Sequence, residues 1–194
     1  MAAQQDRSLS TIDFDDDRYT VEQSLIRNKY AAYDSAGDLV LRGKQKLLKM
    51  KEEFPFVDAD GEEVFTVKAG GIIDVAGNYA ITDAATGDRV AILDNDFSLL
   101  QDTWTVRDGE TEAVIARIDS RGAAVTLARN LIPIVGPLIP HKYEITDQQG
   151  GHVGTISGQL SLKDRYDITI DDASGVPKDA IIAGAMVIDA IQGN

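Results

Sequence analysis

The sequence predicts a mainly β protein, in which about twelve antiparallel strands close into a barrel around a central hydrophobic C-terminal helix. Three observations predict this fold. A single long helical pattern, residues 177–192, ends a chain that otherwise consists of short strand-like runs and tight turns. A turn pattern, D-x-x-G-x-x-V, recurs between those runs. The helical segment is apolar on every side, so it must be buried, and a closed barrel would bury it without leaving sheet edges.

The first segment, residues 1–18, is predicted to be an acidic, flexible tail that precedes a single domain formed by residues 19–194. The tail contains the sequence DFDDD and shows no hydrophobic periodicity. Its carboxylates, Asp13 and Asp15 to Asp17, could in principle hold a cation. They lack the spacing of a calcium loop, so a solvated acidic segment is the favoured interpretation.

The β signal begins at Tyr19, and the recurring turn then divides the chain into hairpins. In each copy the Asp side chain can bond the backbone, the Gly supplies a positive φ, and the Val restarts a strand. A further turn is predicted at Asp108-Gly109. The copies of the recurring turn begin at Asp34, Asp58, Asp83 (with one inserted residue), Asp119, Asp147 and Asp172 (a partial copy).

The predicted helix begins at Pro177, where the missing N–H is not needed, and stops before Gly193. Asp179 lies in its first turn and favours the positive end of the helix dipole. The uncharged stretch 180–188 has nine residues, whereas a membrane span needs about 20. We therefore expect a core helix and no transmembrane segment. Asp189 lies on one of its apolar sides and needs a partner or an opening to water.

The composition excludes some classes of function but does not identify one. The 194 residues include no cysteine and carry a formal net charge of −13, and 24 of the 32 acidic residues are aspartates. An ordinary acidic protein would explain this, but the favoured interpretation is adaptation to high salt, which screens the repulsion between carboxylates. The charge argues against nucleic acid as a partner. The N-terminus has no apolar signal core, so a cytoplasmic location is expected.

No catalytic, metal or cofactor site is predicted. The chain lacks the G-x-S-x-G, P-loop, H-E-x-x-H and G-x-G-x-x-G patterns. Asp58-x-Asp60-Gly61 faintly resembles a calcium loop, but Ala69 stands where that loop needs a glutamate. His141 and His152 have no nucleophile or ligand set beside them by spacing.

A cluster of cations is the main candidate binding site. Arg42, Lys44 and Lys46 alternate in the sequence RGKQK, so in a strand their side chains would share one face. One interpretation is an anion site for a phosphate, a lipid headgroup or an acidic peptide. The favoured alternative is a charged edge strand, or cations that balance nearby carboxylates.

A proline-interrupted apolar segment, residues 123–140, breaks the hairpin rhythm. Pro133, Pro137 and Pro140 disfavour both a central strand and a long helix. The favoured interpretation is a crossover packed over a barrel end. The alternative is an exposed membrane or partner loop, whose apolar residues would be Leu131, Ile132, Ile134, Val135, Leu138 and Ile139.

The serial D-x-x-G hairpins, the SLLQDTW stretch that ends at Trp104 and the apolar C-terminal helix resemble the LURP-one-related family. That family belongs to the tubby C-terminal-like superfamily, together with tubby proteins and phospholipid scramblases. The resemblance implies a twelve-stranded barrel around a central helix. Tubby domains bind phosphoinositides through a basic surface, but no lipid-binding motif can be matched residue by residue here. The acidic composition is similar to that of proteins from salt-loving archaea.

These observations lead us to expect a non-enzymatic, cytoplasmic binding or scaffold protein of the LURP-one-related type, which engages a protein or a small anionic ligand. The first alternative is a peripheral membrane module that binds phospholipid through residues 131–139 and the basic strand. The second alternative is an unrecognised enzyme that uses aspartates and His141.

Overall fold

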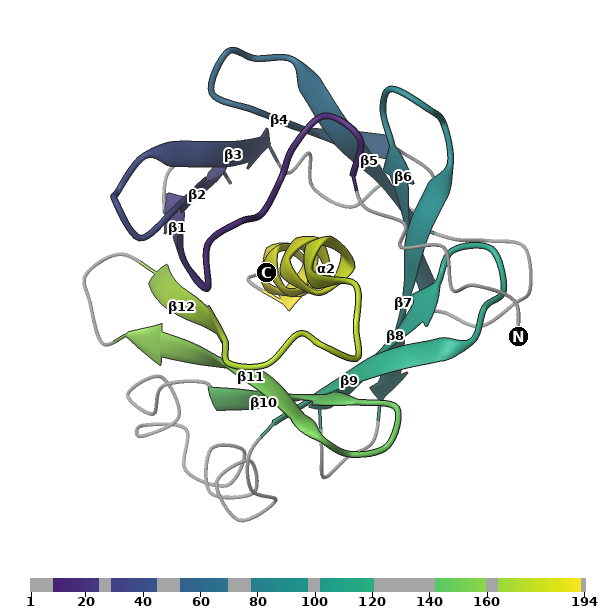
Figure 1. Cartoon of the computed structure of the whole chain (residues 1–194). Coiled ribbons are helices and arrows are strands. Elements are labelled where there is room, and N and C mark those ends of the chain that lie inside the picture. The colour runs from purple at the N-terminus through teal and green to yellow at the C-terminus, as the bar shows by residue number, and fades with distance from the viewer. Residues whose placement is uncertain are drawn as a thin grey trace.

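The computed structural model describes residues 9–24, 29–44, 53–69, 78–97, 102–120, 142–159 and 164–192. Within these ranges, twelve strands form one closed antiparallel barrel in which each strand pairs with its neighbours in sequence and β1 pairs with β12 (Figure 1). The strands are β1 Arg18–Ser24, β2 Lys29–Tyr33, β3 Leu39–Lys44, β4 Glu53–Val57, β5 Glu63–Ala69, β6 Asn78–Asp83, β7 Arg89–Phe97, β8 Asp102–Asp108, β9 Val114–Ser120, β10 Lys142–Asp147, β11 His152–Gln159 and β12 Asp164–Ile170.

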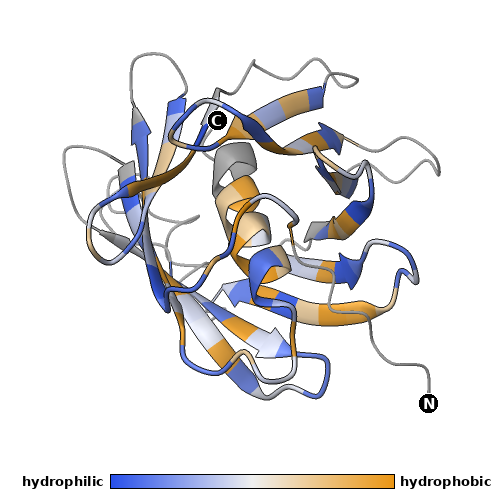
Figure 2. Cartoon of the chain, turned by 45° about the horizontal axis from the view of Figure 1, so that its top comes forward, coloured by the Kyte–Doolittle hydropathy of each residue, from blue (hydrophilic) through white to orange (hydrophobic). Residues whose placement is uncertain are grey.

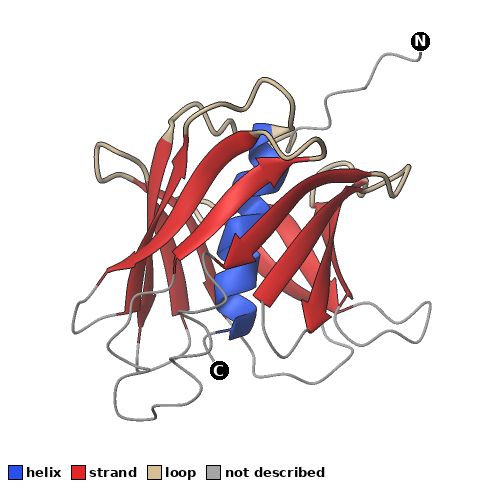
Figure 3. Ribbon diagram, turned by 90° about the horizontal axis from the view of Figure 1, so that it is seen from below, coloured by secondary structure: helices blue, strands red, loops and turns tan. Residues whose placement is uncertain are grey.

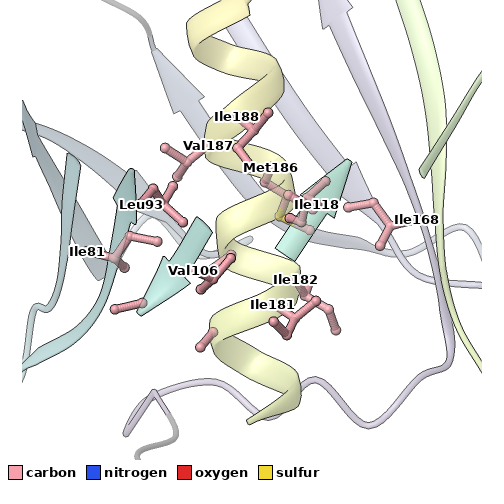
Figure 4. Close-up of a cluster of buried hydrophobic side chains, with 14 of the residues drawn as sticks. Ile81, Leu93, Val106, Ile118, Ile168, Ile181, Ile182, Met186, Val187 and Ile188 are labelled. Carbon is pink, nitrogen blue, oxygen red and sulfur yellow. The ribbon is translucent and has the colours of Figure 1, made fainter. Parts of the chain in front are cut away.

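The helix α2, Lys178–Gln192, lies inside this barrel (Figures 1 and 3). It begins one residue later than the sequence predicts. Each residue from Ala180 to Ile188 is buried, as expected for a helix that is apolar all round. Aliphatic side chains from the strands surround it, including Leu93, Val106 and Ile168 (Figure 4). The predicted fold, a closed barrel of twelve strands with a central C-terminal helix, is confirmed.

The strands alternate between inward and outward residues. In β10, for example, Tyr143 and Ile145 are buried while Lys142 is exposed, which is the period of two that a pleated strand imposes. Figure 2 shows the same alternation as hydrophobic and hydrophilic bands along the strands, with hydrophobic bands on the helix that they enclose. The hydrophobic core is therefore the interior of the barrel, filled by α2.

The recurring turns connect the hairpins at one end of the barrel. The N–H of Gly37, Gly61 and Gly150 donates to the carbonyl of the aspartate three residues earlier, at 3.1–3.3 Å. These glycines have φ values of 85–96°, and Gly87 in the longer turn has a φ of 77°. Glycine adopts this left-handed conformation without a steric penalty. The prediction is confirmed for these four turns, whereas the turn after Asp119 extends outside the described residues.

The N-terminal segment corrects one prediction. Residues 1–8 lie outside the described part, but residues 9–17, which we call the N-terminal strap, are not a flexible tail. They cross the mouth of the barrel near the start of α2 (Figure 1). Leu9 and Phe14 are 3% and 1% exposed, and the Phe14 ring meets the Tyr19 ring edge-on at 5.4 Å. Burying two large apolar side chains stabilises an ordered position by about 3–6 kcal/mol before entropy is subtracted.

Candidate functional site

The strand predicted to be basic is β3. Its two described cations, Arg42 and Lys44, lie at different positions along the strand. Arg42 is exposed, and its Nη2 donates a hydrogen bond to the carbonyl of Ala59 at 3.2 Å, in the turn between β4 and β5. Lys44 is the last residue of β3. Two residues of strand separate them by about 7 Å. Arg42 is therefore engaged with a turn, and Lys44 is left nearer to the opposite end of the barrel.

A second lysine, Lys29, joins Lys44 in the folded sheet. The two residues are Cα partners in the antiparallel ladder between β2 and β3. Directly opposite residues in such a ladder lie about 4.5–5.5 Å apart, and like charges there are destabilising. Lys29 is exposed, and its partner on the other side is Ser24 of β1, which carries no compensating charge. We call Lys29 and Lys44 the lysine pair.

Other predicted site residues lie outside the described ranges. Lys46 belongs to residues 45–52, and His141 and the whole apolar segment belong to residues 121–141. The predictions for Leu131, Ile132, Ile134, Val135, Leu138 and Ile139 therefore stay predictions.

His152 is held between two carboxylates. Its Nδ1 lies 3.1 Å from Glu144 Oε1 on β10, and its Nε2 lies 2.9 Å from Asp171 Oδ2, just after β12. The hydrogen bonds to Asp171 and Glu144 raise the pKa of His152 above its usual value, because each carboxylate favours the charged imidazolium. With a carboxylate at both ring nitrogens, the imidazole has no free nitrogen to accept a proton from a substrate. This arrangement ties three chain segments together.

Asp83 is a buried carboxylate that accepts several hydrogen bonds. It is 2% exposed and accepts the backbone N–H of Ala85 and Thr86 within its own turn. It also accepts the N–H of Ser10 at 2.7 Å and the Ser10 hydroxyl at 2.9–3.0 Å. Burial alone would raise the pKa of Asp83, but the hydrogen bonds from Ser10, Thr86 and Ala85 outweigh it, and the pKa lies below its usual value. The carboxylate is therefore ionised at neutral pH.

Both a family model and a solved structure resemble this chain. The model of the LURP-one-related family matches residues 39–189. The chain belongs to this family. A crystal structure of a protein from Arabidopsis thaliana resembles this LURP-one-related chain with a TM-score of 0.56 and 13% sequence identity, covering 90% of this chain and 91% of the plant chain. At that identity the likeness shows the fold alone. Curated proteins yield no match.

In this LURP-one-related protein, the described residues contain no group of three or more histidine or acidic side chains that could hold a metal ion. Among the same residues, no helix has the length and hydropathy needed to cross a membrane.

Two features were not predicted from the sequence. One is Lys29 as the partner of Lys44, and the other is the set of hydrogen bonds from Ser10 to Asp83, which we call the clasp. Lys29 had only a partial signal, because pairing the hairpin residue by residue from the predicted turn at Asp34–Gly37 would set Lys29 opposite Arg42. The irregularity between Ala32 and Tyr33 shifts the register, so that Lys44 becomes the partner of Lys29. The clasp had no comparable signal, since it joins residues that lie 73 positions apart.

Proposed function

We propose that this LURP-one-related protein is a non-enzymatic binding protein that captures an anionic group, on a protein partner or a small ligand, at the lysine pair. The observation that supports this proposal is the register that sets Lys29 opposite Lys44. A like-charge pair is unfavourable by itself, and a bound anion would turn that repulsion into two attractive contacts. The surrounding protein carries a net charge of −13, so two adjacent cations form a local exception on an acidic molecule.

The use of His152 supports the non-enzymatic part of the proposal. Both of its ring nitrogens face carboxylates, and a general base needs a free nitrogen within hydrogen-bond reach of the proton it removes. His152 thus connects β11 with β10 and with the segment after β12.

The test is a titration of the full chain with inorganic phosphate and, separately, with an acidic peptide, at fixed ionic strength. We expect saturable binding to the wild type and loss of binding, by at least about tenfold, in the double variant Lys29→Glu/Lys44→Glu. The matched control is Lys142→Glu, which reverses an exposed lysine on β10. Equal binding by the wild type and the double variant would remove the lysine pair as the site.

The single variant Lys29→Glu gives a check that needs no ligand. It replaces a like-charge pair by an opposite-charge pair, so the free energy of unfolding should rise by about 0.2–1 kcal/mol at low salt. The gain should shrink as salt is added, because Lys29 is exposed to solvent and its interactions are screened. Chemical denaturation at two salt concentrations measures both effects. A loss of stability at low salt would show that the two ammonium groups do not repel each other.

The peripheral membrane alternative depends on residues 131–139, which the structure does not describe. Vesicles that contain anionic phospholipid, offered in the same experiment, distinguish it from capture of a soluble anion. Flotation of the protein with such vesicles, without binding of phosphate or peptide, would favour the membrane alternative.

A further inference from the structure

The N-terminal strap is fastened to the barrel by a small number of identifiable bonds. Ser10 is clasped by Asp83 through its backbone N–H and its hydroxyl. The N–H of Leu9 donates to Asp179 Oδ2 at 3.1 Å, in the first turn of α2. Lys178 Nζ lies 3.0 Å from both the carbonyl of Asp15 and Oδ1 of Asp17. The strap thus connects the hairpin between β6 and β7 with the beginning of the central helix.

Asp83 occupies the same turn position as the aspartates of the other hairpins, and it also bonds Ser10. In the other described hairpin turns, the equivalent aspartates bond N–H groups of their own turn: Asp58, for instance, accepts from Asp60, Gly61 and Glu62. Asp147 does the same with Gln149 and Gly151. Asp83 keeps this role and in addition receives both donors of Ser10 from a distant segment. The turn therefore does not require the contact with Ser10.

We propose that Ser10 is a phosphorylation site and that a phosphoryl group on its hydroxyl releases the N-terminal strap from the mouth of the barrel. The donor would be a nucleoside triphosphate bound to an acidophilic serine/threonine kinase. The Ser10 Oγ attacks the γ-phosphorus and forms the new O–P bond. The bond from that phosphorus to the β–γ bridging oxygen breaks, the nucleoside diphosphate leaves, and the hydroxyl proton passes to the kinase.

Electrostatics makes the modified strap incompatible with the clasp. A phosphoserine carries a charge of about −1.5 to −2 at pH 7 and has only acceptor oxygens on its phosphoryl group. Both oxygens of the Asp83 carboxylate lie within 3.0 Å of the Ser10 hydroxyl. The hydrogen bonds and ion pairs of the described residues bring no lysine or arginine to Asp83. Like charges at this separation repel, and the modified side chain no longer supplies a donor between them. The backbone N–H of residue 10 is then the one donor that the clasp keeps.

The strap carries several negative charges, one of them at Asp16, which accepts the N–H of Ser35 at 2.8 Å. It contains four aspartates, Asp13 and Asp15 to Asp17, and Lys178 is the cation that bonds it at the start of α2. Once the clasp opens, Leu9 and Phe14 would leave the core, where they are now buried. Modification would therefore uncover an apolar surface at the barrel mouth and free a negatively charged segment.

The sequence around Ser10 suits a kinase with a basic substrate groove. Asp13 lies three residues after Ser10, and Asp15, Asp16 and Asp17 follow. Complementary charge steers such a segment to a basic groove. Ser10 is an exposed residue although its hydroxyl is bonded, so a brief opening of the strap end presents it to an enzyme.

The first experiment measures hydrogen exchange of the strap amides in full-length variants. In Ser10→Glu, which imitates the added charge, we expect the Leu9 and Ser10-position amides to exchange at least about tenfold faster than in the wild type. Ser10→Ala keeps the backbone bond to Asp83 and should show a smaller increase. The matched control is Thr11→Glu, which adds the same charge at the neighbouring exposed residue and should leave exchange within about twofold of the wild type.

A second variant distinguishes charge repulsion between residue 10 and Asp83 from a general loss of structure. Asp83→Asn removes the negative charge, its oxygen can still accept the turn N–H groups, and its NH2 group can donate to the introduced carboxylate. Ser10→Glu/Asp83→Asn should therefore regain most of the protection that the Leu9 amide loses in Ser10→Glu. The amide of residue 10 is left out of this comparison, because its acceptor, Oδ2 of Asp83, is replaced by that NH2 group. Equal exchange in Ser10→Glu and Thr11→Glu, or the absence of rescue, would overturn the proposed mechanism of release.

The second experiment tests the modification itself. The full chain is incubated with MgATP and an acidophilic kinase, and the product is mapped by mass spectrometry. We expect phosphate on Ser10 and faster strap exchange in the modified fraction, whereas phosphate only at other residues would overturn the assignment. The inference does not depend on the lysine pair, because neither experiment measures anion binding by Lys29 and Lys44.

Discussion

At the scale of single residues, one hairpin turn has a glutamate where the others have glycine. Glu112 has a φ of 58°, in the left-handed region. Its N–H donates to the carbonyl of Asp108 at 3.1 Å, as that of Gly87 donates to Asp83 at 3.0 Å in the turn of equal length. A side chain with a Cβ is strained in this conformation by about 1–2 kcal/mol. The turn between β8 and β9 is therefore a local weak point.

We predict that Glu112→Gly raises the free energy of unfolding by about 0.5–1.5 kcal/mol, because it removes this strain. The change also removes the exposed ion pair between Glu112 and Arg89, at 3.2 Å, which is worth at most about 1 kcal/mol. Urea denaturation that follows the fluorescence of Trp104 measures the difference. The reciprocal control, Gly87→Ala, should destabilise the protein, because Gly87 also has a positive φ. A less stable Glu112→Gly variant would show that the ion pair outweighs the strain.

The same turn shows why sequence reasoning stops short at some residues. The sequence predicts a turn at Asp108-Gly109, and the turn in the structure extends further, from Asp108 to Glu112. Gly109 is needed for a different reason: a Cβ there would come within 1.8 Å of the Arg89 carbonyl oxygen. Close approach between neighbouring hairpins depends on how the sheet closes, and no local pattern of residues records it.

At the scale of elements, the helix was predictable and the strap was not. Residues 177–192 are apolar on every side, and this single property predicts that α2 is buried. The strap has its apolar residues, Leu9 and Phe14, scattered among serines and aspartates without a period. Its position depends on partners such as Asp179, which lies 170 residues from Leu9. Tertiary contacts therefore decide the placement of the strap.

Another long-range connection at this scale makes stability depend on pH. His152 on β11 joins β10 through Glu144 and the segment between β12 and α2 through Asp171. The pKa of His152 is raised in the folded state by these two carboxylates. Its contribution to stability is therefore fully present below the unfolded pKa of about 6.5, and it is lost as the pH rises through the higher folded value.

We predict that His152→Gln destabilises the protein most at about pH 6 and progressively less as the pH is raised through the folded pKa of His152. The stability of the wild type relative to the variant, measured by denaturation at several pH values, should show this decline. NMR titration of the His152 ring gives the folded pKa independently. A difference between wild type and variant that grows with pH would contradict the assignment of a charged imidazolium.

At the scale of the whole molecule, the barrel carries its charge on the outside. The interior is filled by α2 and by inward-facing apolar side chains, and among the described charged residues the buried ones are Asp83, Asp167 and Asp179. The exposed ion pairs that are present, such as Lys68–Glu53 at 2.9 Å, contribute little each. We therefore expect the summed repulsion of a net charge of −13 to destabilise the fold by more than the exposed ion pairs stabilise it.

This balance predicts that salt stabilises the protein. Raising sodium chloride from 0.1 to 1 M shortens the screening length from about 10 to 3 Å, which weakens repulsion across the surface more than it weakens contacts of bonded pairs. We expect the midpoint of thermal unfolding to rise by about 3 °C or more, which corresponds to roughly 1 kcal/mol for a chain of this size. Chloride is the appropriate salt, because sulfate would also stabilise the protein by exclusion from its surface. An unchanged or lower midpoint in 1 M sodium chloride would mean that attractive pairs dominate, and the interpretation of the acidic composition as an adaptation to high salt would then fail.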